Sequence, residues 1–214
     1  MSDVVPFEFD APLTVCVDFK SPFAYLSVAP TRALEARLGY AADWVPLLVA
    51  PLAPPQAATL GDDRGTRHRR MRARYFERDL ERYARAAGID LADIYRPRDV
   101  EIASAGLAWL RSSDRMRSGA YVERVFTRVW QRGAANADVA AVAAMLDEVG
   151  ADGQRFARDV ARAVAELAVL QSRLAAAGLF NVPSYVVAGD VFVGRQHLPM
   201  VEWLLTGRRG AVPI

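Results

Sequence analysis

The chain has 214 residues, of which 52% are hydrophobic and 24% are charged, and its formal net charge is +2 at pH 7. This composition is typical of a globular protein and excludes a disordered chain, a collagen-like repeat and a disulfide-rich scaffold. The length suits one large domain or a compact domain with a large insertion.

No apolar segment is long enough and free enough of proline to cross a bilayer; the longest, residues 44–55, contains four prolines. The N-terminus, MSDVVPFEFDAP, lacks a basic stretch followed by an apolar one, so we expect a cytoplasmic protein without a membrane partner. Cys16 is the only cysteine, which rules out an intramolecular disulfide and a CxxC dithiol. Because it lies between valines in an apolar run, we expect a packed, unreactive thiol.

Six arginines lie within residues 64–74, a pattern that nucleic-acid-binding proteins also show. The overall charge is nearly balanced and no nucleic-acid-binding motif accompanies the cluster, so we expect no nucleic-acid partner. Two histidines and one cysteine without HxxxH or CxxC spacing predict no metal site.

The first predicted elements form a βαβ unit. Residues 13–19, LTVCVDF, are β-branched and aromatic and predict a buried strand. Ser21 as N-cap and Pro22 at the first helical position predict a helix that ends at Gly39. Residues 42–49, ADWVPLLV, predict a second strand, parallel to the first.

A block of helices follows from about residue 50 to 178. One helix is predicted from about Thr66 to Ala87, with an apolar face opposite the arginines and Gly88 at its end. Others are predicted near residues 99–112, 118–132, 136–149 and 154–177, with Gly133, Gly150 and Gly153 in positions expected of helix C-caps.

Strand patterns return after Gly178. PSYVV, a turn at residues 188–190 and VFVG predict a β-hairpin, and HLPMVEWLLTG predicts a last helix. The order β-α-β, helical block, β-β-α is that of an α/β thioredoxin fold with a four-stranded sheet and a large helical insertion. We therefore expect a thioredoxin-like domain of residues 1–50 and 178–214 and an inserted helical domain of residues 51–177.

The junction between the first strand and the first helix is a candidate site, because ligands of α/β proteins bind at strand carboxyl ends and helix N-termini. The Ser21 hydroxyl, the free N–H groups of the first helical turn and the helix dipole can stabilise a thiolate or another anion. On spacing alone, a simple N-cap explains Ser21 as well. Pro183 opens a strand after a helix, and the sequence leaves both a cis and a trans Val182–Pro183 bond open.

Three strings carry a family resemblance: DFKSPFAYL at 18–26, YFERDLERYARAAGI at 75–89 and GLFNVPSYVVAGDVFVGRQHL at 178–198. They resemble the DsbA-like thioredoxin-fold family, in its 2-hydroxychromene-2-carboxylate isomerase and kappa-class glutathione transferase branch. In that branch a serine-proline pair replaces the redox CxxC. The resemblance implies that Ser21 donates a hydrogen bond to the thiolate of glutathione, in a site that includes Pro22 and Phe23. It also implies that the backbone of Val182, before a cis Pro183, pairs with the cysteinyl group of glutathione.

Other positions carry over with changes. Arg72 stands where the family has a glutathione-contacting lysine, and Asp63 aligns with an asparagine and would repel a carboxylate. Gln196 replaces an aspartate that holds the γ-glutamyl amine, so it can accept a hydrogen bond but offers no charge. His197 is a candidate glutathione contact or base, or else a capping or surface histidine. Lys20 is either a contact for an acidic substrate or a solvated loop lysine.

The resemblance implies a glutathione-dependent isomerase or transferase that acts on a small aromatic or carboxylated electrophile and forms a homodimer. Ser21 is then the catalytic residue: it holds a thiolate that adds reversibly to a double bond, and rotation and elimination give the isomer. A binding or scaffold module of the oxidoreductase family, without dithiol redox activity, is the alternative.

Overall fold

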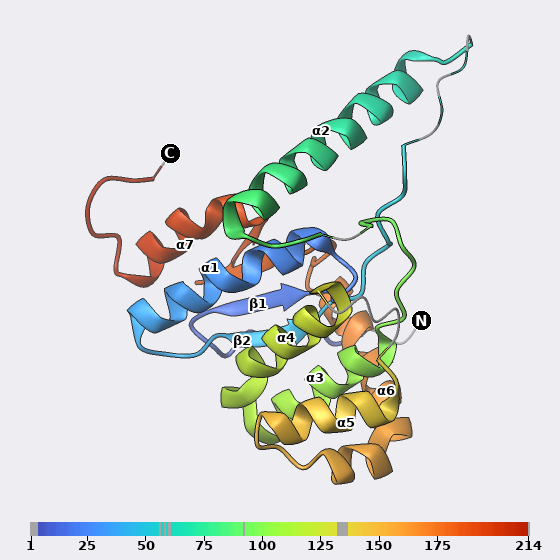
Figure 1. The fold of residues 1–214 in the computed structure, drawn as a ribbon. Coiled ribbons are helices and arrows are strands. Elements are labelled where there is room, and N and C mark those ends of the chain that lie inside the picture. The colour runs from blue at the N-terminus through green and yellow to red at the C-terminus, as the bar shows by residue number, and fades with distance from the viewer. Residues whose placement is uncertain are drawn as a thin grey trace.

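A computed structural model describes residues 4–55, 57, 59, 61–91, 93–131 and 137–213. Its centre is a four-stranded sheet in the order β2-β1-β3-β4, with helices on both faces (Figure 1). The predicted thioredoxin fold is confirmed. Within the described residues, no helix combines the length and apolar character that crossing a membrane requires.

The first half of the sheet is the predicted βαβ unit. β1 (Thr14–Val17) and β2 (Asp43–Pro46) pair in parallel, with Thr14 opposite Asp43. Between them, α1 (Pro22–Leu38) begins after the cap residue Ser21 and ends at Gly39, whose φ of 74° is the left-handed conformation that glycine adopts most easily.

The second half is antiparallel. β3 (Ser184–Val187) pairs with β1 on one side and with β4 (Asp190–Val193) on the other. Ala188 and Gly189, with φ of 53° and 87°, form the tight turn between them, as expected of a two-residue hairpin loop. A 3₁₀ turn, η3 (Arg195–His197), then leads into α7 (Leu198–Leu205).

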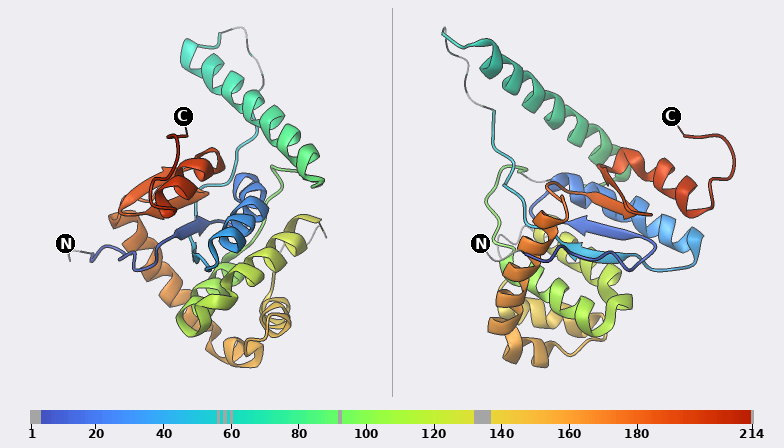
Figure 2. Two further views of the ribbon diagram at one scale, coloured as in Figure 1. Left: turned by 90° about the vertical axis from the view of Figure 1, so that its left-hand side faces the viewer. Right: turned by 180° about the vertical axis from the view of Figure 1, so that it is seen from behind.

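The helical block packs against the β2 side of the sheet (Figure 2). Its elements are α3 (Glu101–Asp114), the 3₁₀ turn η1 (Arg115–Arg117), α4 (Ser118–Phe126), the π-helical η2 (Thr127–Gln131), α5 (Val139–Glu148) and α6 (Gly153–Ala176). The predicted C-cap at Gly133 and the predicted helix start at residue 136 lie outside the described residues.

Two polar contacts join this block to the sheet. Arg111 of α3 makes a bidentate ion pair with the buried carboxylate of Asp43 in β2, with nitrogen–oxygen distances of 2.7 and 2.8 Å. The indole nitrogen of Trp130 donates to the carbonyl oxygen of Phe19 at 2.9 Å. Phe19 lies two residues before Ser21, the N-cap of α1, so this hydrogen bond also links the helical block to the candidate site.

The sequence prediction that Gly153 is a helix C-cap is wrong. It is the first residue of α6, and its backbone nitrogen donates to the Asp147 carboxylate at 2.8 Å. A Cβ atom at this position would lie 2.1 Å from the carbonyl oxygen of Ala143 in α5. Glycine is therefore required here by the close approach of two helices and not by a left-handed helix end.

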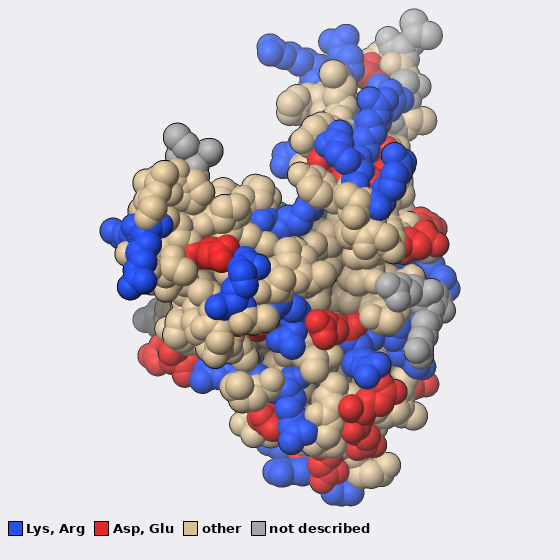
Figure 3. All heavy atoms as spheres, turned by 60° about the vertical axis from the view of Figure 1, so that its left-hand side comes forward, with Lys and Arg blue, Asp and Glu red and all other residues tan. Residues whose placement is uncertain are grey.

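α2 (Arg64–Ala87) lies apart from the other inserted helices. Its C-terminal half packs on α1 through a small cluster of Leu26, Leu80 and Ala84, with Phe23 at its edge. Its N-terminal half projects away from the rest of the chain (Figures 1 and 2), and arginine side chains gather along it (Figure 3). The predicted apolar face thus holds only one half of the helix against the protein.

Candidate functional site

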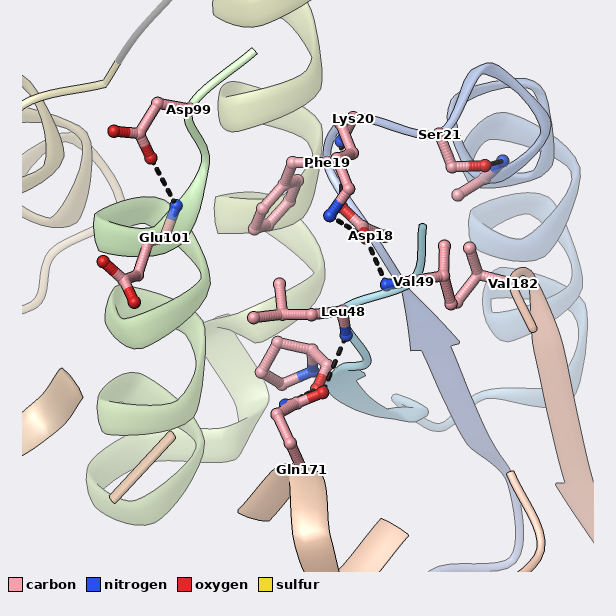
Figure 4. Close-up of polar contacts among 12 residues, drawn as sticks. Asp18, Phe19, Lys20, Ser21, Leu48, Val49, Asp99, Glu101, Gln171 and Val182 are labelled. Carbon is pink, nitrogen blue, oxygen red and sulfur yellow. Dashed lines mark hydrogen bonds and ion pairs between the residues drawn. The ribbon is translucent and has the colours of Figure 1, made fainter. Parts of the chain in front are cut away.

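A buried carboxylate holds the chain that leaves β1. The Asp18 side chain is fully buried and accepts hydrogen bonds from the backbone nitrogens of Lys20 (3.1 Å) and Val49 (2.8 Å). Its Oδ2 atom also lies 2.7 Å from the Lys20 ammonium (Figure 4). Asp18 therefore joins the segments that follow β1 and β2. The signal for it in the sequence was a charged residue at the end of an apolar strand.

Ser21 combines the two roles that its position allows. Its Oγ atom accepts a hydrogen bond from the backbone nitrogen of Ala24 at 3.3 Å, which is an N-cap contact. A hydroxyl has one donor and two acceptor sites, so this cap uses a lone pair and leaves the proton for another acceptor. The N–H of Phe23, in the first helical turn, has no acceptor within its own helix. Ser21 can therefore cap α1 and bind an anion at the same time.

The segment before β3 faces this helix start. The Val182–Pro183 bond is cis, as the resemblance implies, and Val182 and Ser21 both lie around the carboxyl end of β1 (Figure 4). The Val182 backbone nitrogen donates to the Oδ1 atom of Asn181 at 2.9 Å. The exposed Asn181 side chain thus occupies the Val182 N–H, a backbone group that the resemblance pairs with the cysteinyl group of glutathione.

Ser21 and Val182 open into a cavity of about 670 Å³, within the range of about 300–1,000 Å³ of small-ligand sites. It lies between α1, α2, η3 and the segments that precede β3 and follow β2. The space-filling view shows the hollow between α2 and the lobe formed by α7 (Figure 3). The predicted site residues that line it are Lys20, Ser21, Pro22, Phe23, Arg72, Val182, Pro183 and Gln196.

Two residues singled out in the sequence lie elsewhere. His197 is not among the described residues that line the cavity, and its ring packs against Phe192 with a centroid distance of 5.8 Å. Asp63 caps the far end of α2, where its carboxylate accepts from the Thr66 nitrogen at 2.6 Å. At 1.5 Å per residue, it lies about 13 Å along the helix axis from Arg72.

The cavity wall carries several charges. Lys20, Arg72 and Arg195 supply cations, and Asp79 of α2 supplies a carboxylate. The Arg72 guanidinium lies 5.2 Å from the ring centre of Phe76, one turn further along the helix. Sequence reasoning missed Asp79 and Arg195, because nothing in the local pattern of either segment shows that they face each other.

A second cavity of about 320 Å³ adjoins the first. The two share Lys20, Pro51 and Leu52, and the second continues along Tyr95 and Arg96. A molecule in the second cavity would therefore lie near both the Lys20 side chain and the start of α1.

Cys16 offers no thiol to this site. It is fully buried in β1, and burial, with a smaller contribution from the Asp43 carboxylate, raises the pKa of its thiol to about 12. The predicted packed and unreactive thiol fits this environment. Because α1 begins with Ser21-Pro22-Phe23-Ala24, its N-terminus has neither of the cysteines that dithiol exchange requires.

Fold and site together define a thioredoxin-fold protein in which a serine-proline pair occupies the start of the first helix. The model of the DSBA-like thioredoxin domain matches residues 13–206, and the chain belongs to this family. The expected resemblance to DsbA-like proteins is thereby confirmed. No match was found among curated protein sequences.

Solved structures share the whole fold. A 2-hydroxychromene-2-carboxylate isomerase matches with a TM-score of 0.69 and 21% identity, over 91% of this chain and 94% of the other. A protein from Nitrosomonas europaea, proposed to be a protein disulfide isomerase, matches with a TM-score of 0.65 and 12% identity over 92% and 98%. A proposed DsbA oxidoreductase from Streptomyces coelicolor matches with a TM-score of 0.59 and 15% identity, over 94% of this chain and 92% of the other. At these identities the likeness concerns the fold.

Proposed function

We propose that the protein is a glutathione-dependent enzyme, an isomerase of the 2-hydroxychromene-2-carboxylate type or a kappa-type transferase, acting on a small aromatic or carboxylated electrophile. One observation carries the proposal. The Ser21 hydroxyl, whose proton its capping contact leaves free, lies at the start of α1 and opens into a cavity lined by cations. This environment favours an anion, and a thiolate is the anion that the family resemblance supplies.

The residues of the larger cavity fit a tripeptide thiol. Ser21 Oγ–H and the Phe23 N–H would donate to the sulfur, and the Val182 backbone would pair with the central peptide group once the Asn181 amide moves aside. Arg72 would bind a carboxylate. When bound, glutathione would supply the nucleophile that the chain itself lacks at this position.

The smaller cavity offers a place for the electrophile. Tyr95 gives an aromatic wall. Lys20, Arg96 and Arg98 give cations that suit a carboxylate, and the same wall carries the carboxylates of Asp99 and Glu101. Lys20 borders both cavities, and its pairing with Asp18 holds the ammonium near the start of α1. An electrophile bound there would lie next to the thiolate site, as an addition reaction requires.

Calorimetric titration of glutathione, with S-methylglutathione as the matched ligand, tests the proposal. We expect the wild type to prefer the free thiol, and Ser21→Ala to lose about 1.5–3 kcal/mol of glutathione binding, the range for a hydrogen bond to a charged group. Ser21→Thr keeps a hydroxyl and should restore most of it. Asp138→Ala removes the N-cap of α5 and serves as a control for simple cap loss.

Two outcomes would contradict the proposal. If glutathione gives no heat at several temperatures and no shift in melting temperature, the site does not bind it, and a scaffold function would remain. If Ser21→Ala and the wild type bind both peptides equally well, Ser21 is a cap only. If glutathione binds as expected, an assay with isomer substrates separates an enzyme from a glutathione-binding module. An enzyme should turn these substrates over, and Ser21→Ala should lose that turnover.

A further inference from the structure

A third cavity, the α3–α6 cavity, has a volume of about 410 Å³ and lies between α3, α6 and the segment that precedes β1. This volume is within the range of about 300–1,000 Å³ of small-ligand sites. Among the described residues, none that lines it also lines either of the two cavities around Lys20. A molecule bound there would therefore leave the proposed glutathione site open.

The α3–α6 cavity has an apolar surface. Phe7 lines it and is only 7% exposed, and the Phe7 backbone nitrogen donates to the carbonyl oxygen of Arg173 in α6 at 3.0 Å. Val169 and Leu170 of α6 also line the cavity, and Val169 is 62% exposed. The apolar part of a ligand would cover the Val169 side chain, and removing such a surface from water is favourable.

Three arginines line the α3–α6 cavity, and two of them are already paired. Arg111 makes the bidentate ion pair with Asp43 of β2. Arg162 donates to the carboxylates of Asp159 at 2.9 Å and Glu166 at 3.1 Å. Among the described residues that line the cavity, Glu166 is the only acid. The third arginine therefore decides which charge the cavity offers to a ligand.

This third arginine, Arg173, has no such partner. It is half-buried, and within the described part of the chain no carboxylate lies at ion-pair distance from its guanidinium. Its Nε atom is buried and has no hydrogen-bond partner there either. The guanidinium carbons of Arg173 and Arg111 lie 5.8 and 4.9 Å from the ring centre of Phe7. A cation that is partly withdrawn from water without a counter-charge favours an anion beside it.

We propose that the α3–α6 cavity binds a small carboxylic acid with an aromatic body. The Arg173 guanidinium donates to the carboxylate, and the aromatic body covers Phe7 and Val169. Residues four apart on a helix share a face, so the cation and the exposed apolar side chain of α6 are neighbours. Arginine binds carboxylates with charge-assisted hydrogen bonds, and aromatic rings pack on both phenylalanine and guanidinium planes.

The number of unpaired cations favours a carboxylate over a phosphate ester. One arginine without a partner balances the single charge of a carboxylate, whereas a phosphate ester carries about −1.5 to −2 at pH 7. The site does not depend on the proposed glutathione function, because the two cavities share no lining residue among those described.

A cysteine placed at the cavity wall gives a local measure of binding. Val169→Cys is alkylated with iodoacetamide, and the buried Cys16 adds no background. We expect 1-naphthoate to slow this alkylation at least about fivefold, because a ligand in a cavity covers its wall. The uncharged 1-naphthamide should need an about tenfold higher concentration, since it lacks the charge-assisted bond. Ala168→Cys is the matched control, because residue 168 is exposed on α6 outside the cavity and should not be protected.

A second substitution in the Val169→Cys protein tests the cation. Arg173→Gln should raise the 1-naphthoate concentration that gives half-protection at least about tenfold. Arg158→Gln removes the same charge from an exposed position on α6 outside the cavity and should leave that concentration unchanged. S-methylglutathione should not alter the protection.

Four results would overturn the inference, and none of them bears on whether glutathione binds at Ser21. If 1-naphthoate does not protect the Val169→Cys thiol, the cavity is not a carboxylate site. If 1-naphthamide protects equally well, the cavity is an apolar groove without an anion site. If Arg173→Gln and Arg158→Gln have equal effects, Arg173 does not bind the ligand. If S-methylglutathione removes the protection, 1-naphthoate acts from the larger cavity.

Discussion

Asp18 and Lys20 form an ion pair in which the aspartate side chain is fully buried and the lysine side chain is 18% exposed. The same carboxylate accepts two backbone N–H groups, one from Lys20 and one from Val49. A buried carboxylate is stable only when its oxygens are this well paired. The pair therefore links the local turn after β1 to the segment after β2, on which both cavities depend.

Asp18→Asn should destabilise the protein. An amide of the same shape has one acceptor oxygen, so one of the two partly buried N–H groups loses its partner, at a cost of about 1–3 kcal/mol. Urea unfolding would measure the loss. Asp10→Asn is the control, because Asp10 pairs with Arg115 at 3.3 Å on the surface and should change stability by less than about 0.5 kcal/mol. Equal effects of the two substitutions would contradict the role of Asp18.

Ser21→Cys tests the anion-stabilising environment without any ligand. A thiol at the N-terminus of α1 should have a pKa about 1 unit or more below the usual value of about 8.5. The pH dependence of alkylation by iodoacetamide measures it, and the buried Cys16 adds no background. Ser112→Cys, exposed in the last turn of α3, should show no lowered pKa. A pKa at or above 8.5 for Ser21→Cys would rule out a thiolate-stabilising helix start.

Cys16 should make stability fall in alkaline solution. Burial raises its pKa from 9.0 to about 12 in the folded protein, so the unfolded chain loses the proton first as the pH rises. The contribution of the protonated Cys16 thiol to the free energy of unfolding is fully present below pH 9. It is lost at about 1.4 kcal/mol per pH unit between pH 9 and 12. Urea unfolding of the wild type and Cys16→Ala between about pH 8 and 11 checks this, because other titrating groups cancel between the two. Parallel pH profiles would contradict the prediction.

Asn181→Ala should strengthen glutathione binding. The Asn181 amide occupies the Val182 N–H at 2.9 Å, and a ligand that pairs with this backbone must displace it. Removal of the competing bond, worth about 0.5–1.5 kcal/mol, should raise affinity about two- to tenfold. Calorimetry should show the same gain for S-methylglutathione, because the change acts on the peptide backbone and not on the thiol. Weaker binding would show that Asn181 itself contacts the ligand.

The sequence by itself determined the elements whose causes are local. The start of α1 follows from Ser21 and Pro22, its end from Gly39, and the hairpin turn from Gly189, because a cap or a turn depends on the conformation of a few neighbouring residues. The paired motifs around Ser21 and Val182 also located the centre of the larger cavity. A resemblance was needed for the second motif, since the dipeptide alone left the isomer of the bond open.

Only the tertiary structure decided which distant residues share a site. Asp79 and Arg195 meet because α2 packs on α1 next to η3, and no pattern within either segment shows this. The local sequence around Gly153 predicts a helix end, yet glycine is required there because α5 and α6 approach each other closely. Packing between segments depends on shape and burial summed over the whole chain, whereas caps and turns depend on their neighbours. The centre of the candidate site was therefore predictable, and the charges around its wall were not.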